Sequence, residues 1–257
     1  MTDNPNGEVT LQYTGNGIAT ISFFHPAQNS LPSALLELLA QKIEQAGDNK
    51  KTRIIVLKSG GDRTFCAGAS FDELLQIRDK EAGTQFFSGF ARVINAMRKS
   101  PKIVIARVQG KTVGGGVGLA AAADYCLATE AAAVKLSELA IGIGPFVISP
   151  AVIRKIGLPA FSQLTIRAAD FQPAQWAKEK GLYNEVYADV NEMDAALDAL
   201  AGKLVSYNPD ALTELKRILW ADTADWNEIL ERRAAVSGEL VLSVFTQQAL
   251  QDFMNKK

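Results

Sequence analysis

Three consecutive glycines, Gly114, Gly115 and Gly116, lie between a β-branched, strand-like run and an alanine-rich, helix-like run that continues to Asp124. Glycine lacks a Cβ, so neighbouring groups can approach its backbone closely. The first N–H groups of the following helix have no partner inside the helix and lie at the positive end of its dipole. Such amides can stabilise a developing oxyanion, although a turn of this kind can also serve close packing alone.

Nucleotide-binding motifs do not fit this glycine run. A phosphate-binding loop that used Gly110-Lys111-Thr112 would need a glycine where the chain has Ile105. A dinucleotide fingerprint that starts at Gly114 ends on Leu119 rather than on glycine. The run is therefore interpreted as a tight turn between a strand and a helix.

A second segment of small residues is Phe65-Cys66-Ala67-Gly68-Ala69-Ser70, which also follows a strand-like run and precedes a helix-like one. Open α/β sheets place their ligands at the carboxyl ends of strands. Two such turns side by side would direct two backbone N–H donors at one oxygen, which is the geometry of an oxyanion hole.

The elements that position these turns follow from hydrophobic periodicity. Strands are expected at residues 8–13, 18–24, 53–58, 103–108, 125–128 and 133–136, and helices at 31–46 (with Ser33 as a possible cap) and 71–98, with a break near Gly83. The interval 60–70 is expected to be a loop, and the chain from Pro150 onward to be almost wholly helical, ending in a long amphipathic stretch at 226–253. This alternation predicts crossover units over a mostly parallel sheet. Phe146, Val147 and Ile148 are unusually apolar for a loop and are expected to line a pocket.

Composition excludes several classes of protein. The 257 residues are 47% hydrophobic and carry a formal charge of −1, so nucleic acid and anionic membranes are poor default partners. Cys66 and Cys126 have no metal-ligand spacing, which suits a reducing compartment. The first residues lack a secretory signal, and no apolar run is long enough for a membrane span. A cytoplasmic protein without a metal is expected.

Taken in order, the segments resemble the crotonase (enoyl-CoA hydratase/isomerase) superfamily. The matching segments are Asn29-Ser30-Leu31, Phe65 to Ser70, Gly114 to Gly116, Leu136-Ser137-Glu138 with Gly142, and Gly181 to Val186. The resemblance implies an α/β fold, a spiral of ββα and βββα units over residues 1–200, with a helical trimerisation region at 201–257. It also implies an acyl-CoA thioester substrate, no separate cofactor, and a homotrimer or dimer of trimers.

The resemblance assigns roles to individual residues. The Ala69 and Gly115 amides would hold the thioester oxygen, and Glu138 would be the catalytic acid or base. Cys66 and Ala67 would present backbone to CoA. The other expected substrate contacts are Gly68, Gly114, Gly118 and Phe146.

One departure from the family pattern leaves the reaction open. A second hydratase glutamate is expected where this chain has Gly118, so a hydration that uses two carboxylates is in doubt, unless Asp72 or Glu73 replaces the missing acid. The motifs around Gly118, Glu138 and the Pro145–Pro150 segment are similar to bacterial 3-methylglutaconyl-CoA hydratases of leucine breakdown. Hydration is therefore favoured. The alternatives are a Δ3,Δ2-enoyl-CoA isomerase with one glutamate and an acyl-CoA-binding protein without this chemistry.

The remaining reactive side chains are interpreted more simply. His25, the single histidine, precedes Pro26 and is expected to be a loop residue rather than a base. Ser137 lacks the G-x-S-x-G elbow of a serine hydrolase. Asp124 is expected to pair structurally.

Overall fold

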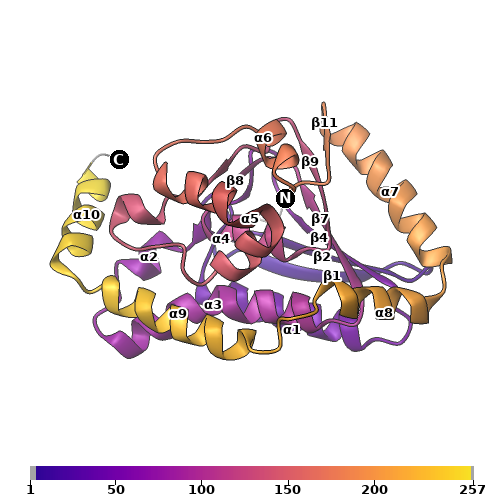
Figure 1. Ribbon diagram of the computed structural model, residues 1–257, viewed down its shortest axis with the longest axis horizontal. Coiled ribbons are helices and arrows are strands. Elements are labelled where there is room, and N and C mark those ends of the chain that lie inside the picture. Colours follow the sequence, from indigo (N-terminus) through magenta and orange to yellow (C-terminus); the bar gives the residue numbers. More distant parts are fainter. Residues whose placement is uncertain (1–3, 256–257) are drawn as a thin grey trace.

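The computed structural model describes residues 4–255 and is built around a six-stranded sheet (Figure 1). In spatial order its strands are β1 (Glu8–Tyr13), β2 (Ile18–Phe24), β4 (Ile54–Ser59), β7 (Ile103–Val108), β9 (Tyr125–Thr129) and β11 (Glu185–Tyr187). Only the hairpin of β1 and β2 is antiparallel in this sheet, and the other neighbours are parallel. The predicted hairpin and the mostly parallel sheet are confirmed. β11 was not predicted, because its three residues lie between helices.

Two smaller sheets carry the small-residue turns. Strand β3 (Ser30–Leu31) pairs with β6 (Gly68–Ala69), and β8 (Lys111–Val113) lies between β5 (Thr64–Cys66) and β10 (Val134–Lys135). The prediction of a loop throughout 60–70 was wrong, because strands of two or three residues are too short to show an alternating pattern. Each pass of the chain adds a long strand to the large sheet and then a short strand beside it, as expected for a spiral.

The helices largely follow the predicted pattern. They are α1 (Ser33–Asp48), α2 (Phe71–Leu74), α3 (Lys80–Lys99), α4 (Gly115–Ala122), the 3-10 turn η1 (Glu138–Ile141), α5 (Ser149–Ile166), α6 (Ala174–Glu179), α7 (Val190–Ser206), α8 (Pro209–Leu219), α9 (Trp226–Leu240) and α10 (Val244–Asn255). The break near Gly83 was misplaced: α3 begins after Asp79, whose carboxylate accepts a 2.8 Å hydrogen bond from the Ala82 amide. Gly83 lies inside α3, where a Cβ would lie 2.7 Å from the Gly238 carbonyl oxygen. This glycine therefore permits the close contact of α3 with α9. Ser33 does not cap α1, since its hydroxyl donates to Glu73 instead.

Both faces of the large sheet are covered. Along β4, Ile55 and Leu57 belong to the core beneath α1, whereas Ile54 and Val56 belong to a second core with Met193 of α7. This burial on both faces explains why β4 is apolar at successive positions. Figure 1 shows α1 and α3 along one side of the sheet and α7 on the other.

The carboxyl-terminal region is helical, as predicted, but residues 226–253 do not form one continuous helix. α9 packs along α3 of the same chain, and α10 turns back to contact η1 (Figure 1). Within the described residues, no helix has both the length and the apolarity that a membrane crossing requires. The role of this region in trimerisation stays a prediction.

A buried ion pair attaches α8 to the sheet. The Asp124 carboxylate accepts hydrogen bonds of 2.7 Å each from Lys216 Nζ, Trp220 Nε1 and the Val104 amide. The Asp124 and Lys216 side chains are 2% and 3% exposed. The structural pairing predicted for Asp124 is confirmed.

Candidate active site

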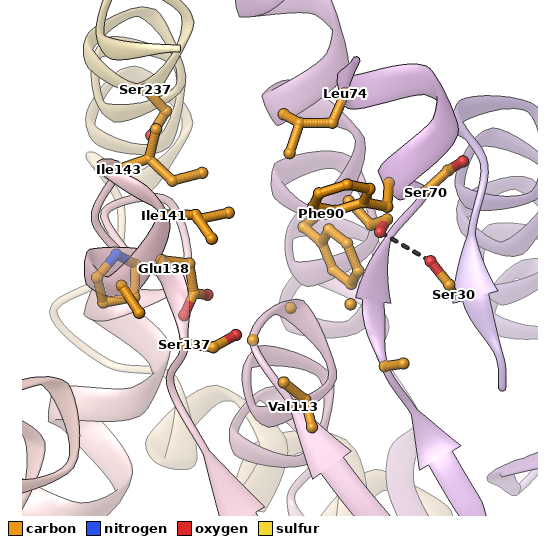
Figure 2. Close-up of a pocket in the computed structure, with 18 of the residues that line it drawn as sticks. Ser30, Ser70, Leu74, Phe90, Val113, Ser137, Glu138, Ile141, Ile143 and Ser237 are labelled. Carbon is orange, nitrogen blue, oxygen red and sulfur yellow. Dashed lines mark hydrogen bonds between the residues drawn. The ribbon is translucent and has the colours of Figure 1, made fainter. Parts of the chain in front are cut away.

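A cavity of about 830 Å³ opens where the two small-residue turns meet η1 and α3. Its wall includes both turns, the aromatic face of α3, the first residues of η1 and the segment between η1 and α5. Figure 2 shows Glu138 and Ile141 on one side of this space and Phe90 and Leu74 on the other. The short strands therefore bring segments that are far apart in the sequence to one site.

The two turns lie side by side. A Cβ on Gly68, whose φ is +93°, would lie only 3.6 Å from the Gly115 amide nitrogen. Gly115 is the first residue of α4, so its N–H has no acceptor within that helix. Ala69, next to Gly68, is held in β6, and its carbonyl accepts a 2.8 Å hydrogen bond from the Ser30 hydroxyl (dashed in Figure 2). This arrangement suits the predicted pair of amide donors.

Glu138 is directly beside the glycine turn. A Cβ on Gly114 would lie 3.1 Å from Glu138 Oε1, and the φ of +54° at Gly114 is one that L side chains rarely adopt. Glycine at position 114 therefore serves both the turn and the room for the carboxylate.

The carboxyl group of Glu138 is poorly solvated. Its Oε2 atom is buried and, among the described residues, has no hydrogen-bond partner. Burial raises its pKa from 4.5 to about 7, and a hydrogen bond from its own backbone amide opposes part of that rise. A carboxyl group with a pKa near neutrality can both accept and return a proton, which is what general acid–base catalysis requires.

Helix α10 helps to fix the turn that carries Glu138. Gly142 ends η1 with a φ of +83°, and the Ile143 amide donates a 3.1 Å hydrogen bond to the Glu138 carbonyl. The buried Thr246 hydroxyl donates a 3.0 Å hydrogen bond to the Gly142 carbonyl. The carboxyl-terminal helix is therefore part of the support of the site in its own chain.

Most of the remaining wall is apolar. α3 contributes Phe86, Phe87 and Phe90, and a Cβ on Gly115 would lie 2.3 Å from Phe90 Cζ. The prediction that the loop from Phe146 to Ile148 lines a pocket is confirmed. An acyl chain would therefore lie against hydrocarbon and aromatic side chains.

Gly118 does not lie on the cavity wall. A Cβ at that position would lie 2.4 Å from Ile148 Cγ2, and Ile148 lines the cavity in its place. The two proposed replacements for the second acid differ in their position relative to the cavity. Glu73 accepts hydrogen bonds from the Ser33 amide and hydroxyl, at 2.9 and 2.7 Å, and is not on the wall, whereas Asp72 is.

The predicted substrate contacts divide into two groups. Ala67, Gly68, Gly114 and Phe146 line the cavity, as do Ala69, Gly115 and Glu138. Gly118 and Cys66 are not among the described lining residues, and their contact with the substrate stays a prediction. Cys66 is fully buried, and its carbonyl oxygen would lie 2.5 Å from a Cβ on Gly116, so its backbone packs against α4.

His25 and Lys135 are among the wall residues that had not been assigned to the site from the sequence. His25 lines the cavity, and its Nδ1 accepts a 3.3 Å hydrogen bond from the Ala27 amide. Burial lowers the His25 pKa, although nearby Asp72 and Glu73 oppose this effect. Lys135 also lines the cavity, with its Nζ 4.5 Å from the centre of the Phe171 ring. No motif in the sequence around His25 or Lys135 indicates that the two residues line the same cavity.

Comparison with known proteins relates the chain to one family. The enoyl-CoA hydratase/isomerase family model matches residues 13–257. Methylglutaconyl-CoA hydratase, mitochondrial, of Rattus norvegicus is 34% identical over 170 residues, or 66% of this chain and 53% of that protein. The alignment thus spans about half of the rat protein. Carnitinyl-CoA dehydratase of Salmonella enteritidis is 29% identical over 214 residues, or 81% of this chain and 79% of that protein.

The fold agrees as well. The crystal structure of enoyl-CoA hydratase from Bacillus halodurans matches with a TM-score of 0.89 and 19% identity, covering 95% of this chain and 99% of that one. The α/β spiral predicted for the chain is thus confirmed. Because the family model spans nearly the whole sequence, the chain belongs to the enoyl-CoA hydratase/isomerase family, with the enzyme chemistry of that family and the crotonase fold.

Proposed function

We propose that the enzyme hydrates an enoyl-CoA thioester, with Glu138 as its proton-transferring carboxylate and the Ala69 and Gly115 amides as its oxyanion hole. The observation that carries this proposal is the position of the Glu138 carboxyl group. It adjoins the glycine turn, its Oε2 atom has no partner among the described residues, and its pKa is raised to about 7 by burial.

Hydration with one carboxylate balances chemically. Glu138 accepts a proton from water while the water oxygen bonds to the β-carbon. The electron pair of the double bond moves through the α-carbon to the thioester oxygen, where the two amides stabilise the enolate. When the enolate collapses, the α-carbon takes the proton back from Glu138. Water is added across the double bond, and Glu138 returns to its initial state.

The acyl group that we favour is 3-methylglutaconyl or a similar short branched group. The support is the motif similarity and the name of the rat relative. The terminal carboxylate of such a group needs a cation, and Lys135 is a lysine on the cavity wall. The Lys135 carbonyl accepts a 2.9 Å hydrogen bond from the Gly114 amide, so this residue adjoins the oxyanion turn.

A variant of Lys135 tests this substrate. Lys135→Met should raise KM for 3-methylglutaconyl-CoA about tenfold or more while leaving crotonyl-CoA nearly unchanged, because only the first acyl group carries a carboxylate. Lys111→Met is the matched control, since Lys111 is exposed, also lies near Phe171 and is not on the described wall. Equal losses for both substrates would place Lys135 at the CoA moiety and remove this support.

Double-bond migration is the second candidate, and a specific observation favours it. Ile148 fills the space beside Gly118 where a second carboxylate is expected, and migration needs only one base. Glu138 would remove an α-proton from a Δ3-enoyl-CoA and return it to the γ-carbon of the dienolate.

One assay separates these candidates. Purified native enzyme and the Glu138→Gln variant are each incubated with crotonyl-CoA, 3-methylglutaconyl-CoA and 3-hexenoyl-CoA in ordinary and in deuterated water. The masses of the products are measured by mass spectrometry. Added water that is lost in the Gln variant supports hydration. Migration of the 3-hexenoyl double bond without added water supports the isomerase. Binding of all three esters without either reaction would overturn the catalytic role and leave a CoA-ester-binding protein.

The predicted homotrimer or dimer of trimers is retained as part of the proposal. The exposed fractions of Val244 and Phe245 on α10 are 88% and 69%, so this end of the chain has apolar surface for another copy to cover. Light scattering of the purified protein should give the mass of three or six chains, whereas a monomer would contradict this expectation.

A further inference from the structure

The space next to Gly118 is occupied by the side chain of Ile148. Gly118 is buried in α4, and a Cβ there would lie 2.4 Å from Ile148 Cγ2 and 2.8 Å from Ile148 Cβ. The next neighbour is Ile94 Cδ1, at 3.7 Å. Contacts below 3 Å require a shift of the neighbouring atom, so no side chain fits at position 118 while Ile148 stays in place.

Ile148 belongs to the reaction chamber as well as to the core. It lines the same cavity as Glu138, yet it is only 3% exposed. It therefore separates Gly118 from the cavity and presents a hydrocarbon surface at the position where the family pattern calls for a carboxylate.

The backbone around Ile148 is held from two sides. Ile148 lies at the start of α5, where the Val152 amide donates a 3.0 Å hydrogen bond to its carbonyl. The adjacent Ser149 is buried, its hydroxyl donates to the Phe146 carbonyl, and Arg233 of α9 donates to that hydroxyl. The plug formed by Ile148 is thus anchored to both α5 and α9.

We propose that Ile148 is a specificity-determining residue that closes the second proton-transfer position and confines proton transfer to Glu138. This inference rests on the proposed role of Glu138. A hydrocarbon wall cannot activate or orient water, so Ile148 leaves the activation of water to Glu138 alone and slows hydration relative to proton exchange at the acyl chain. Removing the plug and supplying a carboxylate at position 118 should shift this balance toward hydration.

The test compares Ile148→Ala with the double variant Gly118→Glu/Ile148→Ala. Crotonyl-CoA hydration and deuterium exchange from the solvent are measured in the same reaction by mass spectrometry. Because a general acid or base contributes roughly 10²–10⁴ in rate, the double variant should raise the ratio of hydration to exchange by at least about tenfold. Ile148→Val, which keeps most of the plug, should leave the ratio nearly unchanged.

Two results would overturn the proposal. The first is a folded double variant that binds crotonyl-CoA with the same ratio of hydration to exchange as Ile148→Ala. The second is a hydration rate at least tenfold lower in Asp72→Asn with exchange unchanged, because Asp72 would then be the second acid.

A stability measurement covers the case in which the glutamate variant does not fold. Gly118→Ala should lower Tm in the native background and less in the Ile148→Ala background, since alanine lacks the Cγ2 atom at 2.4 Å and leaves only the 2.8 Å contact with its Cβ. Equal losses in both backgrounds would refute the plug. Glu138→Gln keeps the two proposals distinct: exchange that persists in that variant removes the role of Glu138, whereas the Gly118–Ile148 coupling in Tm is unaffected by it.

Discussion

Replacing Glu138 by glutamine should change how the stability of the enzyme depends on pH. Burial raises the carboxyl pKa from 4.5 to about 7 in the folded protein. Since each tenfold change in proton affinity is worth about 1.4 kcal/mol, the buried carboxylate costs roughly 3 kcal/mol when it is ionised. Glutamine has a similar shape and no charge, so Glu138→Gln removes this cost.

The direction of this pH dependence follows from the linkage between proton binding and folding. Below about pH 4.5 the carboxyl group is neutral in both the folded and the unfolded chain. The free energies of unfolding of the native protein and of Glu138→Gln therefore differ by a constant amount. Between pH 4.5 and 7 the unfolded chain ionises first, and the native protein loses stability relative to Glu138→Gln. Above about pH 7 the difference in unfolding free energy should level off, with Glu138→Gln favoured by roughly 3 kcal/mol more than at low pH.

Urea unfolding of both proteins at several pH values from 4.5 to 8.5 measures this difference. Any fixed effect of the buried amide cancels, because only the change with pH is compared. A difference that stays constant across this range, or that favours the native protein as the pH rises, would refute the assignment of a poorly solvated carboxyl group with a raised pKa.

Three further predictions follow from the same structure. The native kcat/KM should rise with pH up to about 7, as the Glu138 base form appears, and a pH–rate profile checks this. Gly115→Ala should lower kcat about 10²-fold or more with CoA binding retained, because the new Cβ lies 2.3 Å from Phe90 Cζ and displaces the oxyanion turn; a loss below tenfold in steady-state assays would contradict it. Lys216→Met should cost about 3–5 kcal/mol in urea unfolding, since Asp124 then keeps a buried charge without its partner, and a loss below 1 kcal/mol would contradict it.

The sequence predicted the main layers of the fold because long elements carry strong periodic patterns. Residues 103–108 are apolar at all positions except Arg107, as is typical of a parallel strand that is covered on both faces. The short strands were missed for the opposite reason. Gly68 and Ala69 form a strand only because Ser30 and Leu31 lie beside them, and such a pairing leaves no local pattern.

The residues of the candidate site likewise fall into those that the sequence could locate and those that it could not. Glycine turns mark backbone constraints directly, so the two turns and Glu138 could be located from residue type and family resemblance. The contact of Gly118 with Ile148 could not, since it joins two helices that approach each other only in the folded chain. Likewise, nothing in the local sequence of His25 or Lys135 indicates that both side chains reach one cavity.

The most direct test of the central claim uses butyryl-CoA, a saturated thioester that can be neither hydrated nor isomerised. If Glu138 and the two amides form and protonate an enolate, the native enzyme should exchange the α-protons of butyryl-CoA with deuterated water, as followed by mass spectrometry. Glu138→Gln should bind the ester but exchange at least about 100-fold more slowly. Exchange at the native rate in that variant, or none in a native enzyme that binds butyryl-CoA, would contradict the account.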